Sequence, residues 1–239
     1  MSRIYFQDLV EEIIADPKPI AFVDTCVYLD LIRLFPKEYL DSNIFSACKT
    51  LANNLSSQPQ SFWLLTADIV EDEWQEHSTE VLKSSDNWFK DLEKKIKRVK
   101  SIAPNIPSIS NNYTYQIYSK SLGQHLFNLS KNLLDQTLVI NHIEDLTAPA
   151  YKRVVSDIMP SSKGKSEIKD CYIFEVFLEL SRHLRSSGLG IPIYFLTSNK
   201  NDFGSPTDSN GKIINDLNAV NATYINNWSW LKSELLPGV

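Results

Sequence analysis

Glycine is scarce in this sequence, with seven among 239 residues, about 3 % where roughly 7 % is usual. The one G-x-G tripeptide, Gly188-Leu189-Gly190, comes before an apolar run. A dinucleotide-binding fingerprint has the opposite order, because its glycines follow a strand and open a helix. The sequence therefore has little material for a glycine loop that holds phosphate through its backbone amides.

Cysteine is also rare, and Cys26, Cys48 and Cys171 are widely spaced with no C-x-x-C pair. Isolated cysteines in an odd number build neither a disulfide framework nor a zinc knuckle, so we interpret them as small buried residues in a reducing compartment. No apolar run approaches the ~20 residues that span a bilayer. The acidic, amphipathic N-terminal segment lacks the apolar stretch of a secretion signal. We expect a cytoplasmic protein without a membrane partner.

An excess of positive charge is missing as well. The chain has 24 basic and 29 acidic residues, which gives a net charge of −5, so no field over the whole protein attracts nucleic acid. An anionic partner must be held by a local patch or through a metal ion. Hydrophobic residues make up 43 % of the chain, which is ample for the core of one large domain.

Short apolar runs alternate with helical patterns along the chain. Continuous apolar runs of this length are typical of strands buried on both faces, and they predict strands at residues 19–23, 62–65, 191–196 and 222–225. Apolar residues at helical spacing predict helices at residues 5–15, 166–185 and 228–235. The alternation indicates an α/β fold with a parallel sheet. We expect one domain over residues 1–239, in which residues 83–158 form a helical insert because no comparable strand run interrupts them.

Acidic residues fall where these predicted strands end. Asp24 ends the first strand, Glu71 and Glu73 open the helix after the second, and Asp202 follows the third by six residues. Asp170 lies near the start of a strongly apolar helix, where a charge needs a partner. Ligands of parallel sheets bind beyond the carboxyl ends of the strands, so these carboxylates are candidates for one site.

Carboxylates that converge repel one another, and a divalent cation makes such a cluster tolerable. Ligation by oxygen alone suits Mg²⁺ or Mn²⁺. Each acid also has a structural interpretation by itself. Asp24 can cap a helix, Glu71 and Glu73 can complement a helix dipole, and Asp202 can belong to a turn. The basic run from Lys90 to Lys100 can be a solvated helix face or an RNA-binding patch.

Four short motifs, taken together and in this order, resemble the PIN domain, a large group of metal-dependent ribonucleases. They are Phe22-Val-Asp24-Thr25, Ala67-Asp-Ile-Val-Glu-Asp-Glu73-Trp, Ile168-Lys-Asp170-Cys-Tyr-Ile-Phe-Glu175 and Phe195-Leu-Thr-Ser-Asn-Lys-Asn-Asp202-Phe203. The resemblance covers residues 18–76 and 160–226, and the longer members with a large insert are a closer match than the compact toxins. It implies a three-layer α/β/α fold around a central parallel sheet.

The resemblance also implies a ligand set. Asp24, Glu73 and Asp170 would bind Mg²⁺ or Mn²⁺. Asn199 stands where many members have an aspartate, and this departure weakens a second metal site unless Asp202 supplies the missing charge.

Residues around the acids have implied supporting roles. Thr197 and Ser198 would hold the Asp24 carboxylate or a water at the metal by hydrogen bonds. We expect Lys163, Lys165 and Lys169, just before Asp170, to hold the phosphate backbone of the substrate.

The resemblance implies an endoribonuclease in which water activated by the metal hydrolyses an RNA phosphodiester, with a toxin or defence role as one possibility. The alternative is a non-catalytic module that binds RNA or protein through a decayed site, which Asn199 favours. A phosphatase with Asp24 as nucleophile would need an aspartate two residues later, where Cys26 stands. Besides RNA, an inhibitor protein or a second copy of the chain are candidate partners.

Overall fold

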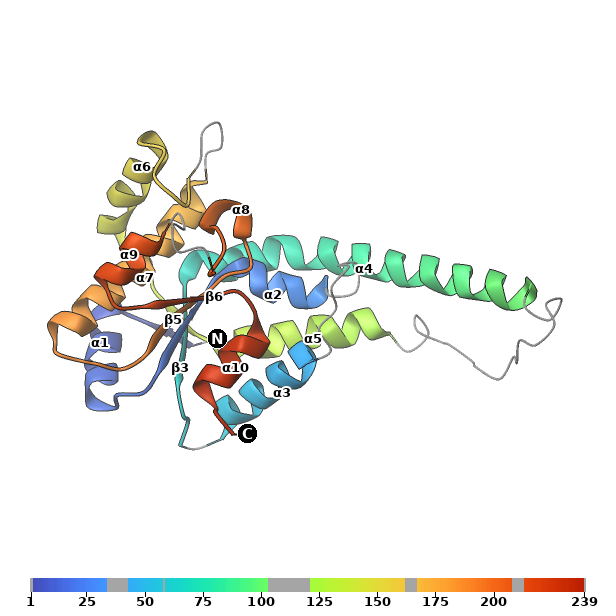
Figure 1. The fold of residues 1–239 in the computed structure, drawn as a ribbon, viewed down its shortest axis with the longest axis horizontal. Helices are drawn as coiled ribbons and strands as arrows, with labels where there is room; N and C mark the ends of the chain where they lie inside the picture. Colours follow the sequence, from blue (N-terminus) through green and yellow to red (C-terminus); the bar gives the residue numbers. More distant parts are fainter. Residues whose placement is uncertain are drawn as a thin grey trace.

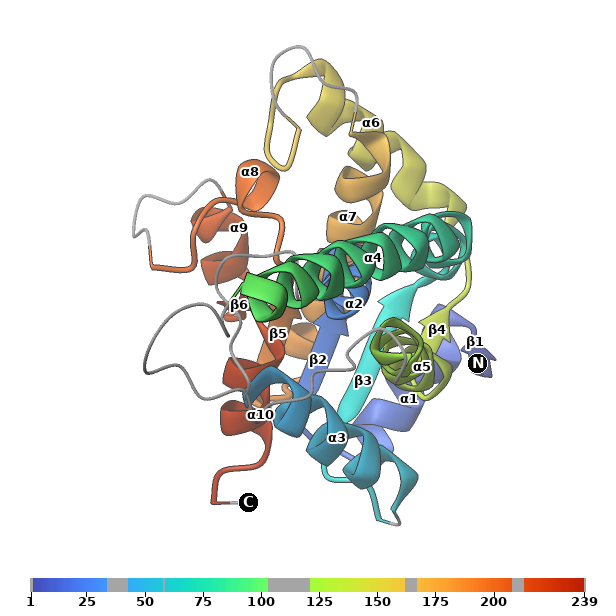
Figure 2. The same ribbon diagram turned by 90° about the vertical axis from the view of Figure 1, so that its right-hand side faces the viewer.

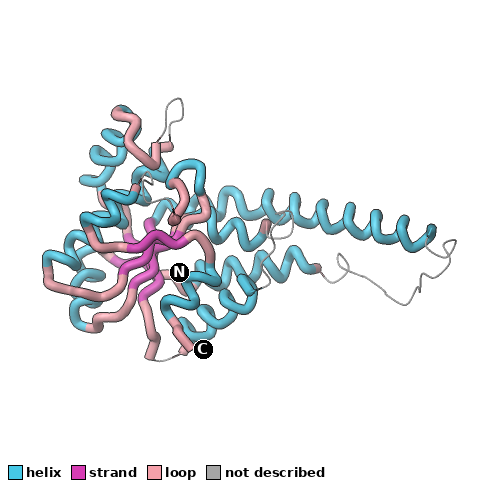
Figure 3. The backbone as a smooth tube through the Cα atoms, in the orientation of Figure 1, coloured by secondary structure: helices cyan, strands magenta, loops and turns pink. Residues whose placement is uncertain are grey.

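The computed structural model describes residues 2–33, 43–57, 59–102, 121–161, 167–207 and 213–238. Six strands in this part of the chain form one sheet in which every pair is parallel. In spatial order they are β1 (Ser2–Ile4), β4 (Leu138–Ile140), β3 (Trp63–Ala67), β2 (Ile20–Val23), β5 (Ile193–Leu196) and β6 (Thr223–Ile225). Figure 3 shows these strands between two groups of helices.

The helices form two layers, so the three-layer α/β/α expectation is confirmed (Figures 1 and 2). One layer contains α1 (Phe6–Ala15), α6 (Thr147–Val155) and α7 (Ile168–Ser186). The other contains α2 (Thr25–Ile32), α3 (Asn43–Ser56), α4 (Asp68–Ile102), α5 (Leu122–Asp135) and α10 (Trp228–Leu235). Two shorter helices, α8 (Lys200–Phe203) and α9 (Ile214–Ala219), connect β5 to β6, and the 3₁₀ helix η2 (Glu144–Leu146) precedes α6.

The expected strands are present, with bounds that differ by one to two residues. Two strands were missed. β1 is three residues long and partly exposed, and β4 is equally short, so neither has the apolar run that reveals a central strand. Residues 83–158, which we expected to form a helical insert, also contain β4, and this strand pairs with both β1 and β3.

The register of the central strands determines which residues meet at the carboxyl edge of the sheet. Every residue of β2 is buried, as expected for a strand that is covered on both faces. Val23 of β2 lies opposite Leu196 of β5. The next residues, Asp24 and Thr197, therefore leave the sheet side by side, and the Asp24 amide donates to the Leu196 carbonyl at 3.0 Å.

An aromatic cluster lies beneath this edge. It joins β2, α7, β5 and α8 through ring contacts with centroids 4.8 to 6.4 Å apart among Phe22, Phe174, Phe177, Phe195 and Phe203. These four elements carry or directly precede three of the four acidic motifs named above, those of Asp24, Asp170 and Asp202. Packed aromatic rings are large and rigid anchors, so the cluster holds the backbone of those motifs in place.

Helix α4 is unusually long, at 35 residues. Its first part buries a stripe at intervals of three or four residues, made of Val70, Trp74, Ser78, Val81, Ser85 and Phe89. Beyond Phe89 none of its described side chains is buried, and Figure 1 shows this end projecting past the body of the protein. Among the described helices, none is apolar over a sufficient length to cross a membrane.

A buried ion pair joins α6 to α7. Arg153 Nε donates to Glu175 Oε1, and Arg153 Nη1 donates to Asp216 Oδ2 at 3.0 Å and to the Met159 carbonyl at 2.6 Å. The side chains of Arg153 and Glu175 are each 8 % exposed. The guanidinium also lies over the Phe174 ring, 5.0 Å from its centroid, so the pair braces α7 where the aromatic cluster begins.

We predict that Arg153→Met destabilises the protein by about 3 kcal/mol, because it leaves the buried Glu175 carboxylate without its main partner. The double variant Arg153→Met/Glu175→Leu should recover part of this loss, since it removes both charges. Urea denaturation measures both. Lys131→Met, which breaks an exposed pair with Asp135, is the control and should cost less than about 1 kcal/mol. An Arg153→Met variant as stable as this control would contradict the prediction.

Candidate metal centre

Four segments bring acidic side chains to the carboxyl edge of the sheet. Asp24 follows β2, Glu73 lies on the second turn of α4 after β3, Asp170 lies in the first turn of α7, and Asp202 lies in α8 just after β5. In Figure 2 the helices α4, α7 and α8 lie beyond the upper ends of the strands. This is the place at which parallel sheets bind ligands.

Asp24 is 2 % exposed and is held from both sides. Its Oδ1 accepts a hydrogen bond from the Thr25 amide at 2.7 Å, and its Oδ2 accepts from Thr197 Oγ1 at 2.7 Å and from Cys26 Sγ at 2.9 Å. Burial raises the pKa of the Asp24 carboxyl, and the charge of Glu73 adds to this effect while the hydrogen bonds oppose it. Asp24 both caps α2 and faces the acids, so its two interpretations coexist.

Glu73 is coupled to the Asp24 segment. Its Oε2 accepts from Thr25 Oγ1 at 2.6 Å, and its Oε1 lies 3.4 Å from Lys169 Nζ. Glu71, the acid two residues earlier, instead forms an ion pair with Arg3 on β1 at 2.7 Å. The structure therefore places Glu73, and not Glu71, with Asp24.

Asp170 and Asp202 lie together with a third acid, Glu167. One carboxylate oxygen from each of the three lies within 4.8 Å of the others. Oxygens on opposite sides of a Mg²⁺ ion, each at about 2.1 Å, would lie about 4.2 Å apart, so a small contraction suffices for shared ligation. Sequence analysis missed Glu167. Its spacing of three residues from Asp170 could have revealed it, since residues at this spacing are neighbours on a helix.

The electrostatics of Asp170 connect all of these acids. Burial raises the pKa of the Asp170 carboxyl to about 8, with further contributions from the charges of Asp24, Glu73, Asp202 and Glu167. Without a cation the Asp170 carboxyl therefore keeps its proton at neutral pH. The donors are carboxylate oxygens, which fit Mg²⁺ or Mn²⁺, and a divalent ion would offset the repulsion.

Asn199 lies between two of the acids. Its Nδ2 donates to Asp202 Oδ2 at 2.7 Å and to Asp170 Oδ2 at 3.3 Å, and its Oδ1 accepts from the Asp202 amide at 3.4 Å as the cap of α8. An amide donor at this position relieves repulsion between the two carboxylates. Asn199, the residue at which the sequence departs from the pattern that it resembles, thus contacts two acids of the centre.

A protein-family model for the PIN domain matches residues 21–203. The chain belongs to the PIN domain family. PIN domains are a family of metal-dependent nucleases, and the acidic cluster of this chain accords with that chemistry. Searches of the curated proteins and of the solved structures found no match.

Thr197 and Ser198, beside the acids of this PIN domain, form hydrogen bonds with different partners. Thr197 makes the expected hydrogen bond with Asp24. Ser198 does not, because its hydroxyl donates to Asp30 Oδ2 at 2.6 Å and its amide donates to Cys26 Sγ at 3.2 Å. Ser198 thus holds α2 through Asp30, an acid that sequence analysis did not single out.

Cys26 is more than a small buried residue. Burial, followed by the charge of Asp24, raises the pKa of the Cys26 thiol well above its usual value. The thiol therefore keeps its proton and donates a hydrogen bond to Asp24 Oδ2. Cys48 and Cys171 are buried as expected.

The predicted substrate-binding lysines lie partly outside the structure. Lys163 and Lys165 fall outside the described residues. Lys169 lies at the rim of the centre, where its ammonium is 3.4 Å from Glu73 Oε1 and 3.8 Å from Glu76 Oε2. Its side chain is 47 % exposed, so its ammonium can reach solvent.

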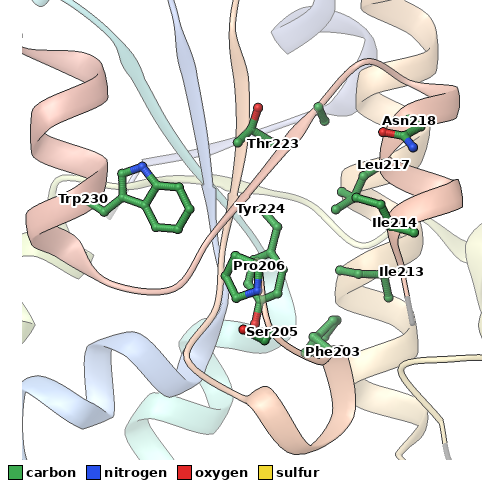
Figure 4. Close-up of a pocket in the computed structure, with 11 residues that line it drawn as sticks. Phe203, Ser205, Pro206, Ile213, Ile214, Leu217, Asn218, Thr223, Tyr224 and Trp230 are labelled. Carbon is green, nitrogen blue, oxygen red and sulfur yellow. The ribbon is translucent and has the colours of Figure 1, made fainter. Parts of the chain in front are cut away.

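The apolar pocket drawn in Figure 4 is a separate feature. It has a volume of about 300 Å³ and is lined by residues of the segment from α8 to α10, among them Phe203, Leu217, Tyr224 and Trp230. None of its lining residues is charged. The pocket therefore cannot supply carboxylate ligands to the metal centre.

We predict that the free energy of unfolding of the metal-free protein falls as the pH rises between about 5 and 8. The folded-state pKa of Asp170, about 8, exceeds the ordinary value of 3.8, so in this window the folded state binds the additional proton and a rising pH removes its advantage. One such group contributes at most about 1.4 kcal/mol per pH unit. Urea denaturation in a chelator measures the slope.

Asp170→Asn should flatten that slope, and added Mg²⁺ should do the same for the unaltered protein. Asp8→Asn, on the exposed side of α1, is the matched control and should leave the slope unchanged. Equal slopes for Asp170→Asn and the unaltered protein would contradict the electrostatic interpretation of the centre.

We also predict that Asn199→Asp lowers the stability of the metal-free protein and tightens Mn²⁺ binding by about tenfold, because it replaces a donor with a charged ligand. Calorimetric titration with Mn²⁺ measures the affinity. Asn199→Ala removes the donor without adding charge, so it should destabilise the metal-free protein without tightening the metal. Equal Mn²⁺ affinities for these two variants would show that the added charge does not reach the ion.

Proposed function

We propose that this PIN domain is a Mg²⁺- or Mn²⁺-dependent endoribonuclease. The observation that carries the proposal is the convergence of five carboxylates, in which Asp24, Glu73, Asp202 and Glu167 all act on the charge of Asp170. Such a group is costly to fold without a cation. A divalent cation at this edge of the sheet would offset that cost and would attract an anionic substrate.

The residues of the centre divide into ligands and supports. Asp170, Asp202 and Glu167 would hold the ion, and Asp24 and Glu73 complete the negative surface around it. When bound, Mg²⁺ or Mn²⁺ would neutralise charge on the scissile phosphate and lower the pKa of an attacking water. Thr197 orients Asp24 and Thr25 orients Glu73, so neither carboxylate needs to reorganise when substrate arrives.

Lys169 is suited to hold the substrate. Its ammonium already balances Glu73 and Glu76 and can turn to a phosphate oxygen once a metal ion nearby offsets the charge of Glu73. Contacts with phosphate position a nucleic acid without specifying its sequence. Lys163 and Lys165 remain predicted for the same role. An inhibitor protein and a second copy of the chain remain predicted partners.

A non-catalytic module is the second candidate, because Asn199 is neutral where many family members are acidic. Glu167 weighs against it, since this acid restores the charge that the amide lacks. We favour hydrolysis that leaves a 5′-phosphate and a 3′-hydroxyl, as the family implies. A toxin or defence role fits such an activity and is part of the proposal.

A cleavage assay separates the two candidates. We expect the protein to cut end-labelled single-stranded RNA with Mn²⁺ or Mg²⁺ and not with a chelator. Asp24→Asn and Asp170→Asn should each reduce the rate by at least about a hundredfold, because each removes a charge on which metal binding depends.

Asp8→Asn is the matched control and should cut at the rate of the unaltered protein. Cleavage that persists in the chelator, or in both acid variants, would overturn the proposed chemistry. RNA that is bound but never cut would favour the non-catalytic module.

A further inference from the structure

The exposed end of α4 carries a separate concentration of positive charge. We call residues 90–102 of α4 the arm. From Lys90 to Lys100 it contains six basic and two acidic residues, although the whole chain has a net charge of −5. Sequence analysis left this run open between a solvated face and an RNA-binding patch.

Five of the six basic residues of the arm share one side of the helix, and Lys100 lies outside it. With 3.6 residues per turn, Lys90, Lys94, Lys95, Lys97 and Arg98 fall within an arc of about 160°. All five are exposed. Asp91 falls within the same arc, so this face of the helix presents five basic residues and one acid, with a net positive charge.

The apolar residues of the arm lie on the opposite side. Leu92, Ile96 and Val99 fall within about 60° of one another on the same projection, and Leu92 and Ile96 are half-buried. The basic arc is therefore distinct from the side of α4 that packs, and it is not covered by the packing of the described helices.

Three of the arm's cations form no ion pair with a described carboxylate, although Asp91 and Glu93 stand four residues before Lys95 and Lys97. Lys94 pairs with Asp91 at 3.1 Å, but no described carboxylate forms an ion pair with Lys95, Lys97 or Arg98. A solvated face usually mixes charges of both signs. Here basic residues outnumber acidic ones by six to two between Lys90 and Lys100, and a patch of net positive charge on an acidic protein can hold a polyanion.

Helix geometry also fixes the distance between this patch and the metal centre. Glu73 and Lys95 lie on the same helix, so their 22-residue separation corresponds to about 33 Å along its axis. A stacked strand with one phosphate every 3.4 Å or so needs roughly ten nucleotides to cover that distance. Figure 1 shows α4 running from the sheet edge to the arm without interruption.

We propose that the arm is a second RNA-binding surface, on which Lys95, Lys97 and Arg98 hold the backbone of a single-stranded RNA whose other part lies at the metal centre. This rests on the proposed function for the identity of the anion. Long RNAs then bind more tightly than short ones, and the gain is electrostatic and independent of sequence.

The test compares two variants with equal changes in charge. The arm variant is Lys95→Glu/Lys97→Glu/Arg98→Glu, and the control is Lys49→Glu/Lys131→Glu/Lys152→Glu, at exposed positions on α3, α5 and α6. Binding of a labelled single-stranded RNA of about 30 nucleotides, well above the ten that span the distance, is measured by fluorescence anisotropy in a chelator. No cleavage is needed for this measurement.

We expect the arm variant to bind at least about tenfold more weakly and its log–log dependence of affinity on salt to become shallower by about two, since three phosphate contacts contribute about 0.7 each. The control should stay within about threefold of the unaltered protein. An arm variant with unchanged affinity for RNA overturns the proposal. The same result is expected if the arm binds a protein instead of RNA. Equal weakening of both variants overturns it as well.

Cleavage gives a second measurement. With Mn²⁺, the arm variant should raise KM for the long RNA and leave kcat unchanged, whereas an RNA of about six nucleotides, too short to span the distance, should be cut as by the unaltered protein. Urea denaturation checks that the variants fold. If the arm variant does not fold, Lys95→Gln/Lys97→Gln/Arg98→Gln takes its place in the comparison. If the unaltered protein does not cleave RNA, the proposed function is refuted. The binding measurement would still decide whether the arm binds RNA.

Discussion

Repulsion among buried carboxylates is the constraint around which this molecule is arranged. Burial raises the pKa of the Asp170 carboxyl, and the charges of four other acids raise it further. The aromatic cluster beneath the sheet edge resists that repulsion, since β2, α7, β5 and α8 are packed ring against ring. A rigid hydrophobic base thus keeps charges together that would separate in water, and a divalent cation is the partner that makes the arrangement favourable.

Small polar groups complete what the aromatic base begins. Thr25, Thr197 and Asn199 each donate to an acid of the centre. These donors hold the carboxylates in one geometry before any ion arrives, so binding a metal ion costs little rearrangement. Helix α4 adds a longer connection, because it places an acid of the centre at its start and a basic patch at its far end.

Sequence patterns predicted the elements with strong local signals. The run Ile-Ala-Phe-Val at residues 20–23 marks a strand that is covered on both faces, whereas Leu138–Ile140 is too short to stand out between two helices. The acids Asp24 and Asp170 were found because they follow or interrupt apolar segments. Glu167 was missed because it precedes the apolar run of α7 and has no such contrast around it.

By itself the sequence determined the type of sheet, the positions of four of its strands along the chain and the oxygen chemistry of the candidate centre, because these follow from local periodicity and residue type. Tertiary structure decided which acids meet. Glu73 joins Asp24 while Glu71 pairs with Arg3, Ser198 holds Asp30, and Asn199 donates to two carboxylates. Such choices depend on strand register and on the direction in which each helix leaves the sheet, and no local pattern encodes the distance between residues that are far apart along the chain.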